Sequence, residues 1–389
     1  MNHKNLELLM LRDKINEIDD NILILLSKRQ LLSAKIAKVK LKHNSQIRDK
    51  ARERLILDRL IIYGKQYKLD SSYITKLFHL IIEDSIFIQQ SILQKDLNCA
   101  YANTAKISFL GPKGSYSHIA ARKYSMRYFD DIIEFSCLNF HDVVYNVENG
   151  IADYAILPIE NTASGSINEV YDLLQNTNLS IVNELFLHID HCILSIPDTN
   201  LEKIKIIYSH LQPFQQCSNF ISLFPHWSLK YTESTAAAMK KVSKLNSSEI
   251  AALGSEDGGI LYTLKVLKRN IANQQYNQTR FIILSRKSIE VSNNVPAKTT
   301  FVVETGQNVS SLVDILLVLR NYSLVINKIE SRPINGNPWE EIFYIDIKSN
   351  LKSINMKNAI KDLNSITCSL KILGCYPSES YLSIEYNKH

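Results

Sequence analysis

The first forty residues carry apolar side chains at heptad spacing. Reading from Leu8, the apolar seam continues through Leu11, Ile15, Ile18, Ile22, Leu25, Leu32, Ile36 and Val39. Such a repeat predicts one long amphipathic helix. Arg29 occupies a seam position between Leu25 and Leu32, where a charge is costly unless an anionic group meets it. We therefore expect the buried face of this helix to hold negative charge.

The pattern divides the whole chain into three regions. Residues 1–97 read as helix almost throughout, with a second helix over 48–63 and a third over 72–92 that opens on a serine cap. Residues 105–286 alternate short apolar runs, loops of small polar residues and amphipathic helices, which is typical of an α/β domain. Residues 298–378 read as strand, helix, two strands, helix and strand. We expect a multidomain protein with an all-α domain, a two-lobed α/β domain and an α+β βαββαβ domain, joined by linkers near 98–105 and 288–297.

Composition is ordinary for a globular protein, with 45% hydrophobic and 22% charged residues. The net charge of +6 is concentrated between Lys28 and Arg59, where eleven Lys or Arg stand against three Asp or Glu. A nucleic-acid surface is one interpretation of this run. The cations alternate with aliphatic residues on a helix, without interleaved aromatics and glycines, so a small anionic ligand fits better than nucleic acid.

The six cysteines, at positions 99, 137, 192, 217, 368 and 375, form no CxxC pair, so we expect neither a metal site nor a disulfide framework. No stretch approaches the roughly 20 apolar residues of a membrane span. Glu7 and Asp13 stand beside the N-terminal leucines, unlike the layout of a signal peptide. The protein is therefore expected to be cytoplasmic, with no membrane partner and no cofactor.

Distances along the first helix indicate a second copy of the chain. At about 1.5 Å per residue, Arg29 and Lys40 lie roughly 16 Å apart, which two long side chains can span onto one small ligand. Arg12 lies roughly 25 Å from Arg29. If all three cations serve one kind of site, Arg12 comes from a second, antiparallel copy, which predicts an intertwined dimer. The alternative is that Arg12 and Lys40 are solvated charges beside the seam.

Further polar residues share helix faces. Asp49, Arg52 and Glu53 stand at i, i+3 and i+4, where an intrahelical salt bridge is the alternative interpretation. Ser85 and Gln89 stand at i, i+4 among isoleucines, where unpaired polar groups would be costly.

At these positions the domain resembles the all-helical class of chorismate mutase, as found at the N-terminus of the family that fuses this enzyme to prephenate dehydratase. The site pattern of that family is matched by Arg12, Arg29, Lys40, Asp49, Arg52, Glu53, Ser85 and Gln89. The resemblance implies an intertwined dimer in which each site borrows an arginine. It also implies that Arg12 and Arg29 bind the two substrate carboxylates, Lys40 and Gln89 the ether oxygen, and Asp49 or Glu53 the hydroxyl. A Claisen rearrangement suits such a set, because it needs a dianion held in a compact shape and no nucleophile or metal.

Four segments of the α/β region end a strand with small polar residues and open a helix: 111–117, 160–166, 233–237 and 254–259. Several helix N-termini around one cleft would bind an anionic molecule, although each alone is more simply a capped helix start.

These segments, with the triplet Thr279, Arg280 and Phe281, resemble prephenate dehydratase from Lys106 to Leu284. The resemblance makes Thr279 the essential residue and matches other cleft positions to Asn161, Thr162, Gln216, Ser234 and Thr235. The chain departs from the family at Leu211, where proline is common, and we expect the effect to stay within the local turn. The reaction removes a ring hydroxyl and a carboxylate together, and the leaving hydroxyl needs a proton donor. Because a free threonine is a poor acid, Thr279 needs neighbours that polarise it.

The last region resembles an ACT regulatory domain through its βαββαβ order and the run Glu330, Ser331, Arg332, Pro333. In that family the domain binds phenylalanine, and a simple dimerisation module is the alternative. The family's Gly-Ala-Leu-Val signature is replaced here by Ser310, Ser311, Leu312 and Val313. Because glycine permits positive φ or close backbone approach, we expect Ser310 to weaken phenylalanine binding and to blunt inhibition.

The three regions together predict a bifunctional enzyme of phenylalanine biosynthesis, an isomerase and a lyase. It would rearrange chorismate to prephenate and then convert prephenate to phenylpyruvate, as a homodimer or higher homo-oligomer with phenylalanine as effector. A non-catalytic amino-acid sensor and a nucleic-acid regulator are the alternatives. A sensor would not need a complete anion cage in the helical domain.

Overall fold

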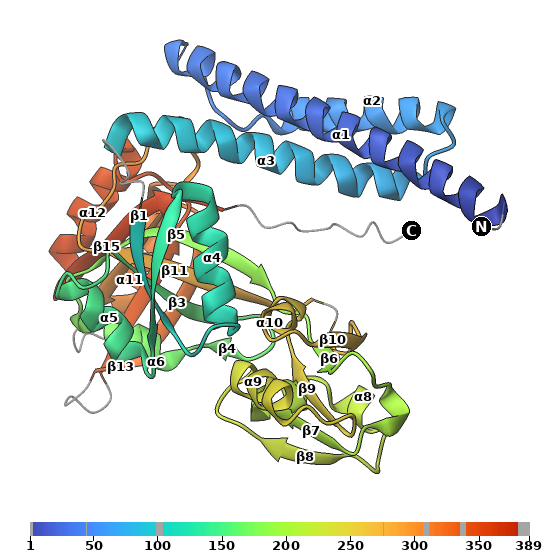
Figure 1. Cartoon of the computed structure of the whole chain (residues 1–389). Helices are drawn as coiled ribbons and strands as arrows, with labels where there is room; N and C mark the ends of the chain where they lie inside the picture. The colour runs from blue at the N-terminus through green and yellow to red at the C-terminus, as the bar shows by residue number, and fades with distance from the viewer. Residues whose placement is uncertain are drawn as a thin grey trace. The chain divides into compact units, whose positions relative to one another are not determined.

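The computed structural model describes residues 3–43, 45–98, 104–274, 276–305, 311–334 and 340–379 (Figure 1). The chain forms two compact units. The first comprises residues 1–100 with 290–296, and the second comprises residues 101–289 with 297–389. The chain therefore enters the first unit twice, once at its start and once between the two later domains.

Three helices make up most of the first unit: α1 (His3–Lys42), α2 (Lys50–Gln66) and α3 (Ser71–Asn98). The long first helix predicted by the heptad spacing is confirmed, since α1 is one unbroken helix of 40 residues. The Asp49 carboxylate caps α2 by accepting a hydrogen bond from the backbone N–H of Arg52 at 2.9 Å, so this helix begins at Lys50. The serine cap predicted for the third helix is wrong, because the Asp70 carboxylate accepts from the backbone N–H of Tyr73 at 2.8 Å.

α1 packs against α3 through a face that differs from the heptad seam. Ser33 and Ala37 are buried there, and their small side chains let the two helices approach closely. The nine apolar seam residues from Leu8 to Val39 remain between 45% and 64% exposed in a single chain. Arg29 lies at the border of the two faces and bonds to α3, so it does not stand in the middle of a buried seam.

Residues 290–296 also belong to the first unit, although the sequence suggested a linker there. The backbone N–H of Ile47 donates to the carbonyl oxygen of Asn294 at 3.2 Å, and the side chains of Val291 and Val295 are buried. This segment therefore packs beside the connection between α1 and α2.

The second unit begins with two lobes (Figure 1). Lobe 1 is a sheet of order β2-β1-β3-β11-β5, with β4 paired to β3. Its elements are β1 (Thr104–Leu110), α4 (Tyr116–Tyr128), β2 (Asp131–Cys137), α5 (Phe140–Glu148), β3 (Tyr154–Asn161), β4 (Gly165–Ser166), α6 (Asn168–Asn176), β5 (Ser180–His188) and β11 (Gln278–Ser285). Its strands are largely apolar because both faces of the sheet are covered.

Lobe 2 is a sheet of order β10-β6-β9-β7-β8. Its elements are β6 (Cys192–Ser195), η1 (Leu201–Lys203), β7 (Ile206–Ser209), α7 (Leu211–Gln216), α8 (Ser218–Ile221), β8 (Ser228–Tyr231), α9 (Thr235–Leu245), β9 (Ile250–Gly254), α10 (Glu256–Leu261) and β10 (Lys265–Lys268). The chain crosses between the lobes twice, from β5 to β6 and from β10 to β11. The two crossovers are bonded to each other, since the backbone N–H of Ile189 donates to the carbonyl oxygen of Asn277 at 2.8 Å.

A third sheet, of order β13-β14-β12-β15, completes the second unit. Its elements follow the expected βαββαβ order: β12 (Ala297–Glu304), α11 (Ser311–Asn321), β13 (Ile326–Pro333), β14 (Glu341–Ile347), α12 (Ile354–Ile366) and β15 (Ser369–Pro377). This sheet shares a hydrophobic core with lobe 1 through residues such as Tyr344, Leu373 and Tyr376. At Gly374 a Cβ would lie 2.1 Å from the carbonyl oxygen of Ile181, so glycine is needed where β15 meets β5.

Within the described ranges, no helix is long and apolar enough to span a membrane, and no group of three His, Cys, Asp or Glu residues could hold a metal ion.

Candidate active sites

Arg29 turns from α1 toward the middle of α3. Its Nη1 donates to the carbonyl oxygen of Ile81 at 2.8 Å and to the hydroxyl of Ser85, which is buried. Burial lowers the pKa of Arg29, and the nearby Asp84 carboxylate partly offsets that effect. Ser85 therefore holds the guanidinium in place.

Gln89 lies one turn beyond Ser85 and is only 7% exposed. Its Nε2 donates to the carbonyl oxygen of Ser85 at 3.1 Å. Its Oε1 is buried without a hydrogen-bond partner among the described residues. A buried carboxamide with one end unmatched is costly, so this position is built for something other than packing.

Lys40 and Asp49 line a second part of the helical unit. They border a cavity of about 700 Å³ together with Ser45, Gln46, Arg48, Lys50 and Pro296. Burial lowers the pKa of Lys40, and the carboxylates of Asp49 and Glu53 oppose the shift. Glu53 is itself held by Arg48, whose Nε lies 3.3 Å from the Glu53 carboxylate. Arg48 was not predicted, because its two acidic partners, Glu53 and Glu83, cannot be paired with it from spacing.

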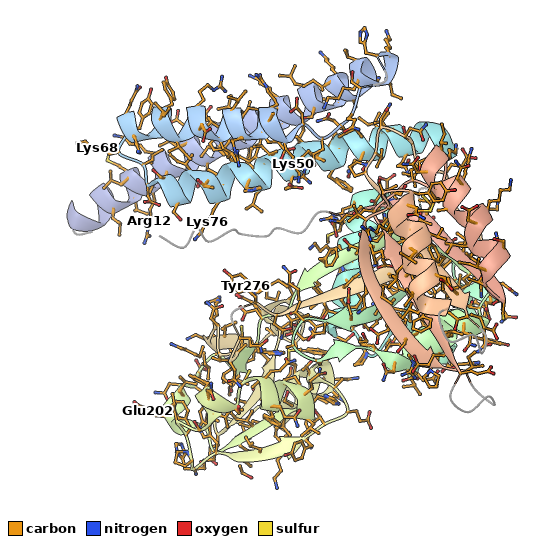
Figure 2. All side chains as sticks on the ribbon, turned by 180° about the vertical axis from the view of Figure 1, so that it is seen from behind. Arg12, Lys50, Lys68, Lys76, Glu202 and Tyr276 are labelled. Carbon is orange, nitrogen blue, oxygen red and sulfur yellow. The ribbon has the colours of Figure 1, made fainter. Side chains whose placement is uncertain are left out.

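Arg12 stands apart from these residues. Figure 2 shows it toward the N-terminal end of α1, and the unbroken helix keeps it roughly 25 Å from Arg29. Arg52 has an exposed side chain, and its backbone N–H forms the cap bond to Asp49. One chain thus joins Arg29, Ser85 and Gln89 in one cluster and places Lys40, Asp49 and Glu53 in a second, while Arg12 belongs to neither.

A cavity of about 690 Å³ lies between lobe 1 and lobe 2. It is lined by six residues that the sequence predicted, namely Asn161, Gln216, Ser234, Thr235, Thr279 and Phe281. The loop after β1 and the two histidines His191 and His210 line it as well. Thr162 lies outside this lining and donates its hydroxyl to the carbonyl oxygen of Tyr276 at 3.3 Å.

Thr279 and Asn161 are adjacent in this cleft. Asn161 Nδ2 donates to the Thr279 hydroxyl oxygen at 2.9 Å, and both side chains are buried. Asn161 Oδ1 accepts from the backbone N–H groups of Ala163 at 2.9 Å and Ser164 at 3.0 Å. The orientation of the carboxamide is therefore fixed by backbone donors, and the Thr279 proton is left free to point elsewhere.

A β-bulge aims Asn161 at the cleft. In the pairing of β11 with β3, Thr279 stands opposite Asn161 and Arg280 opposite Glu160, but Phe281 stands opposite Pro158. Ile159 is the extra residue. Without it the alternation of faces would turn Glu160 into the cleft and Asn161 away from it.

The opposite face of the same strands carries a buried ion cluster, and Arg280 belongs to this cluster rather than to the cleft lining. Its guanidinium contacts Glu184 at 2.9 Å and Asp346 at 2.6 Å, while Lys298 bonds to Glu184 at 2.6 Å. Burial alone would raise the pKa of Asp346, but Arg280 and Lys298 hold it below its usual value. The cluster joins lobe 1 to the third sheet directly behind Thr279.

Three of the four predicted segments open helices. The hydroxyls of Ser115, Ser234 and Ser255 each accept from a backbone N–H in the first turn of α4, α9 and α10. The segment 160–166 instead turns into the short strand β4, and α6 begins only at Asn168. Leu211 is the first residue of α7, where proline would also fit, so its effect is local.

Four of the residues expected to hold phenylalanine lie on the third sheet. Glu330, Ser331, Arg332 and Pro333 end strand β13. Arg332 donates two hydrogen bonds to the Asp172 carboxylate, at 2.9 and 2.8 Å, and Glu330 accepts from Ser166 at 2.6 Å. Leu312 and Val313 open α11, and Ser310 lies outside the described residues.

Comparisons with known proteins match both units. The chorismate mutase type II family matches residues 11–90, and the prephenate dehydratase family matches residues 107–289. The bifunctional chorismate mutase/prephenate dehydratase of Enterobacter agglomerans is 60% identical over 378 residues, which cover 97% of this chain and 98% of that protein. The enzyme of the same name from Escherichia coli K12 is 55% identical over the same shares.

A solved structure extends the likeness to the fold of the second unit. It is prephenate dehydratase from Arthrobacter aurescens in complex with L-Phe, with a TM-score of 0.63 and 25% identity, covering 71% of this chain and 93% of that chain. Both sites thus lie in regions that match the two corresponding enzyme families, and the relatives match along almost the whole length. This chain belongs to the family of bifunctional chorismate mutase/prephenate dehydratases.

Proposed function

We propose that the two residue clusters are the two active sites of this bifunctional enzyme of phenylalanine biosynthesis. The helical unit rearranges chorismate to prephenate, and the cleft of the second unit converts prephenate to phenylpyruvate. The bond from Asn161 to the Thr279 hydroxyl carries the second assignment, because it explains how a weakly acidic threonine becomes a useful donor.

In the mutase site, the side chains accelerate the rearrangement by binding and orienting the substrate. Arg29 binds one carboxylate of chorismate, with Ser85 holding its guanidinium. Lys40 and Gln89 stabilise the charge that develops on the ether oxygen as its bond to carbon breaks. Asp49 or Glu53 accepts a hydrogen bond from the substrate hydroxyl. Arg48 orients Glu53, and Arg52 flanks the site.

The second carboxylate is bound by Arg12 of a second copy of the chain. One chain cannot bring Arg12 to Arg29, and nine apolar seam residues of α1 stay about half exposed in a single copy. An exposed stripe of that length indicates a protein surface that covers it. An antiparallel α1 from a second copy covers the stripe and delivers Arg12 together, so the active form is a homodimer or a higher homo-oligomer.

In the dehydratase cleft, Thr279 assists departure of the ring hydroxyl of prephenate. The bond from the ring to its carboxylate breaks, its electron pair makes the ring aromatic, and the hydroxyl leaves as water once it has taken a proton. Asn161 withdraws electron density from the Thr279 oxygen, which makes the threonine O–H a stronger donor to the leaving group. One solvent proton is consumed for each turnover.

The remaining cleft residues bind the substrate. Ser234 and Thr235 stand at the N-terminus of α9, whose free backbone N–H groups and dipole favour a carboxylate. Gln216 offers a carboxamide from lobe 2, and the ring of Phe281 provides an apolar wall. Thr162 and Arg280 act from outside the cleft, by holding the turn after β3 and the back of β11.

The third sheet acts as an ACT regulatory domain that binds phenylalanine. Its βαββαβ order and the position of Glu330 to Pro333 support this role, and the Arthrobacter aurescens prephenate dehydratase of similar fold was solved in complex with L-Phe. The Ser310 and Ser311 replacements make this binding weaker than the family signature would.

A coupled assay tests the proposal. Purified full-length protein is given chorismate, and chorismate loss and phenylpyruvate formation are followed together across a phenylalanine titration. Formation of phenylpyruvate supports both sites. Chorismate loss with accumulation of prephenate would remove the dehydratase assignment, and no chorismate loss would remove the mutase assignment.

A further inference from the structure

A chain of side-chain hydrogen bonds runs from Thr279 across both crossovers between the lobes. Asn161 Nδ2 donates to Asn277 Oδ1 at 2.7 Å, and Asn277 Nδ2 donates to Gln216 Oε1 at 3.2 Å. The same Gln216 oxygen meets His191 Nε2 at 2.8 Å. Asn277 lies on the crossover into β11 and His191 on the crossover into β6, and both are buried, at 2% and 1% exposed.

The direction of every bond in this chain follows from two backbone N–H groups. Backbone N–H groups can only donate, so Asn161 Oδ1, which accepts from Ala163 and Ser164, must be the oxygen. Asn161 therefore offers its nitrogen to Asn277, and Asn277 in turn offers its nitrogen to Gln216. The Gln216 atom that receives this bond is then an oxygen.

His191 must accordingly carry a proton on Nε2. Its other nitrogen, Nδ1, lies 3.0 Å from the hydroxyl of Tyr116, which has one proton to donate and also lies 2.9 Å from the carbonyl oxygen of Asp190. Burial lowers the pKa of His191 in spite of its bond to Gln216 and the nearby Asp190, which favours the neutral imidazole, so Nδ1 is an acceptor that competes with the Asp190 carbonyl oxygen for the Tyr116 proton. The two donors on Gln216 Oε1 leave the Gln216 N–H2 group as the end of the carboxamide that is available to the cleft.

We propose that His191 and Asn277 are positioning residues of the dehydratase, which fix the Gln216 carboxamide with its N–H2 group toward the substrate. This inference rests on the proposed function of the cleft. An anionic substrate needs donors, and a reversed carboxamide would present an oxygen to a carboxylate. The two residues thus set the polarity of the lobe 2 wall without touching the substrate themselves.

The isosteric change Asn277→Asp tests whether Asn277 fixes the orientation of the Gln216 carboxamide. It replaces the N–H2 group that faces Gln216 with an oxygen, so Gln216 turns its own N–H2 group toward this carboxylate and away from the substrate. We expect kcat/KM for prephenate to fall roughly 10- to 100-fold, the scale of a misplaced binding group. The matched control is Asn273→Asp, an exposed carboxamide on the same crossover that bonds to Gln215 and Ser218, and it should stay within about twofold.

The histidine tautomer provides a readout that a purely structural role would not change. In the full-length protein with ¹⁵N-labelled histidine, the His191 signal, assigned by its loss in His191→Gln, should report a proton on Nε2. In Asn277→Asp the proton should move to Nδ1, because Nε2 then faces an N–H group and must accept. A wild-type proton on Nδ1 would overturn the inference.

Kinetics separate positioning from packing. His191→Gln keeps an N–H donor and should retain most dehydratase turnover, whereas His191→Leu should lose it. In a Gln216→Ala background the same His191→Leu change should cost little, because it acts through Gln216. An undiminished penalty in that background would refute the role. Circular dichroism and thermal unfolding of the same samples report folding of the second unit, and the Asn277→Asp result still decides the inference if His191→Leu does not fold. Unchanged turnover in Thr279→Val would instead remove the proposed function of the cleft, whatever the tautomer.

Discussion

The carboxamide nitrogen of Asn161 lies 2.9 Å from the hydroxyl oxygen of Thr279, across the last pair of residues that β3 and β11 share. This contact exists because a bulge at Ile159 turns Asn161 to the cleft. A threonine whose oxygen already accepts an N–H bond is a better donor to a third group. The pair therefore supplies the polarisation that Thr279 lacks on its own.

Replacing Asn161 with aspartate should reverse this relationship. In Asn161→Asp the Thr279 hydroxyl donates to the new carboxylate and no longer to the leaving group, so we expect phenylpyruvate formation to fall by about 10²- to 10⁴-fold, the usual contribution of a general acid. Thr279→Ser, which keeps the hydroxyl, should retain much of the activity. Both are measured with prephenate as substrate. Normal turnover in Asn161→Asp would contradict the role of the pair.

Arg29→Met should abolish the mutase and spare the dehydratase. The change removes the cation that we propose binds one carboxylate, so we expect at least about a 100-fold loss of chorismate turnover. The matched control is Lys28→Met, which removes a neighbouring exposed cation and should change little. Prephenate turnover should be the same in both variants, and a retained mutase rate in Arg29→Met would remove Arg29 from the site.

Mixing two inactive variants tests whether Arg12 is borrowed. Arg12→Ala and Arg29→Ala chains, unfolded together and refolded, should form mixed dimers in half of the cases. Each mixed dimer holds one site with both native arginines, so roughly a quarter of the wild-type mutase activity should return. Each variant refolded alone gives the baseline. Failure of the mixture to rise above that baseline would remove the partner's Arg12 from the site.

Local patterns explain what the sequence could predict. The long first helix, the βαββαβ order and the neighbours Ser85 and Gln89 all follow from periodicity within one element. The register of β11 on β3 does not, because the bulge at Ile159 leaves no local signal. Arg280 could therefore be placed beside Thr279 in the chain, but not on the opposite face of the sheet.

Partners distant in the chain could not be predicted either. Glu184 and Asp346 meet Arg280 from two different strands, Lys298 meets Glu184 from a third, and no spacing rule connects them. All three side chains are buried, where a lone charge would be costly. A buried charge indicates that a partner exists but does not identify that partner. The roles of His191 and Asn277 could not be predicted from the sequence, because both residues lie on crossovers that have no periodic pattern.

Phenylalanine should bind this enzyme weakly. Ser310 and Ser311 stand where the family signature has glycine and alanine, and a Cβ at the first position hinders close approach of the backbone to a ligand. Calorimetry with the full-length protein should show weak binding and little inhibition of phenylpyruvate formation. The double change Ser310→Gly with Ser311→Ala should lower Kd and restore inhibition. Tight binding by the unchanged protein would refute the expectation.

The loop that lines the cleft after β1 should make the dehydratase sensitive to acid through His118. Its Nδ1 accepts from the backbone N–H of Gly114 at 3.1 Å, and its Nε2 lies 3.1 Å from the Glu134 carboxylate. Burial lowers the pKa of His118 below its ordinary value; Glu134 opposes this shift, and Arg122 and Lys113 add to it. The neutral imidazole is thus the form that holds the loop at pH 7.

The sign of the pH effect follows from that lowered pKa. A group whose folded pKa is depressed stabilises the fold above its unfolded pKa, about 6.5 for histidine, and this stability is lost as the pH falls through the folded value. Protonation also places an N–H against the Gly114 N–H. We expect kcat/KM for prephenate to fall as the pH drops through the lowered pKa of His118. His118→Asn offers an acceptor that does not titrate and should remove this decrease. Rates are corrected with enzyme-free blanks, and mutase turnover in the same samples reports general acid damage. If kcat/KM falls at low pH in the same way in His118→Asn, the titrating group is not His118.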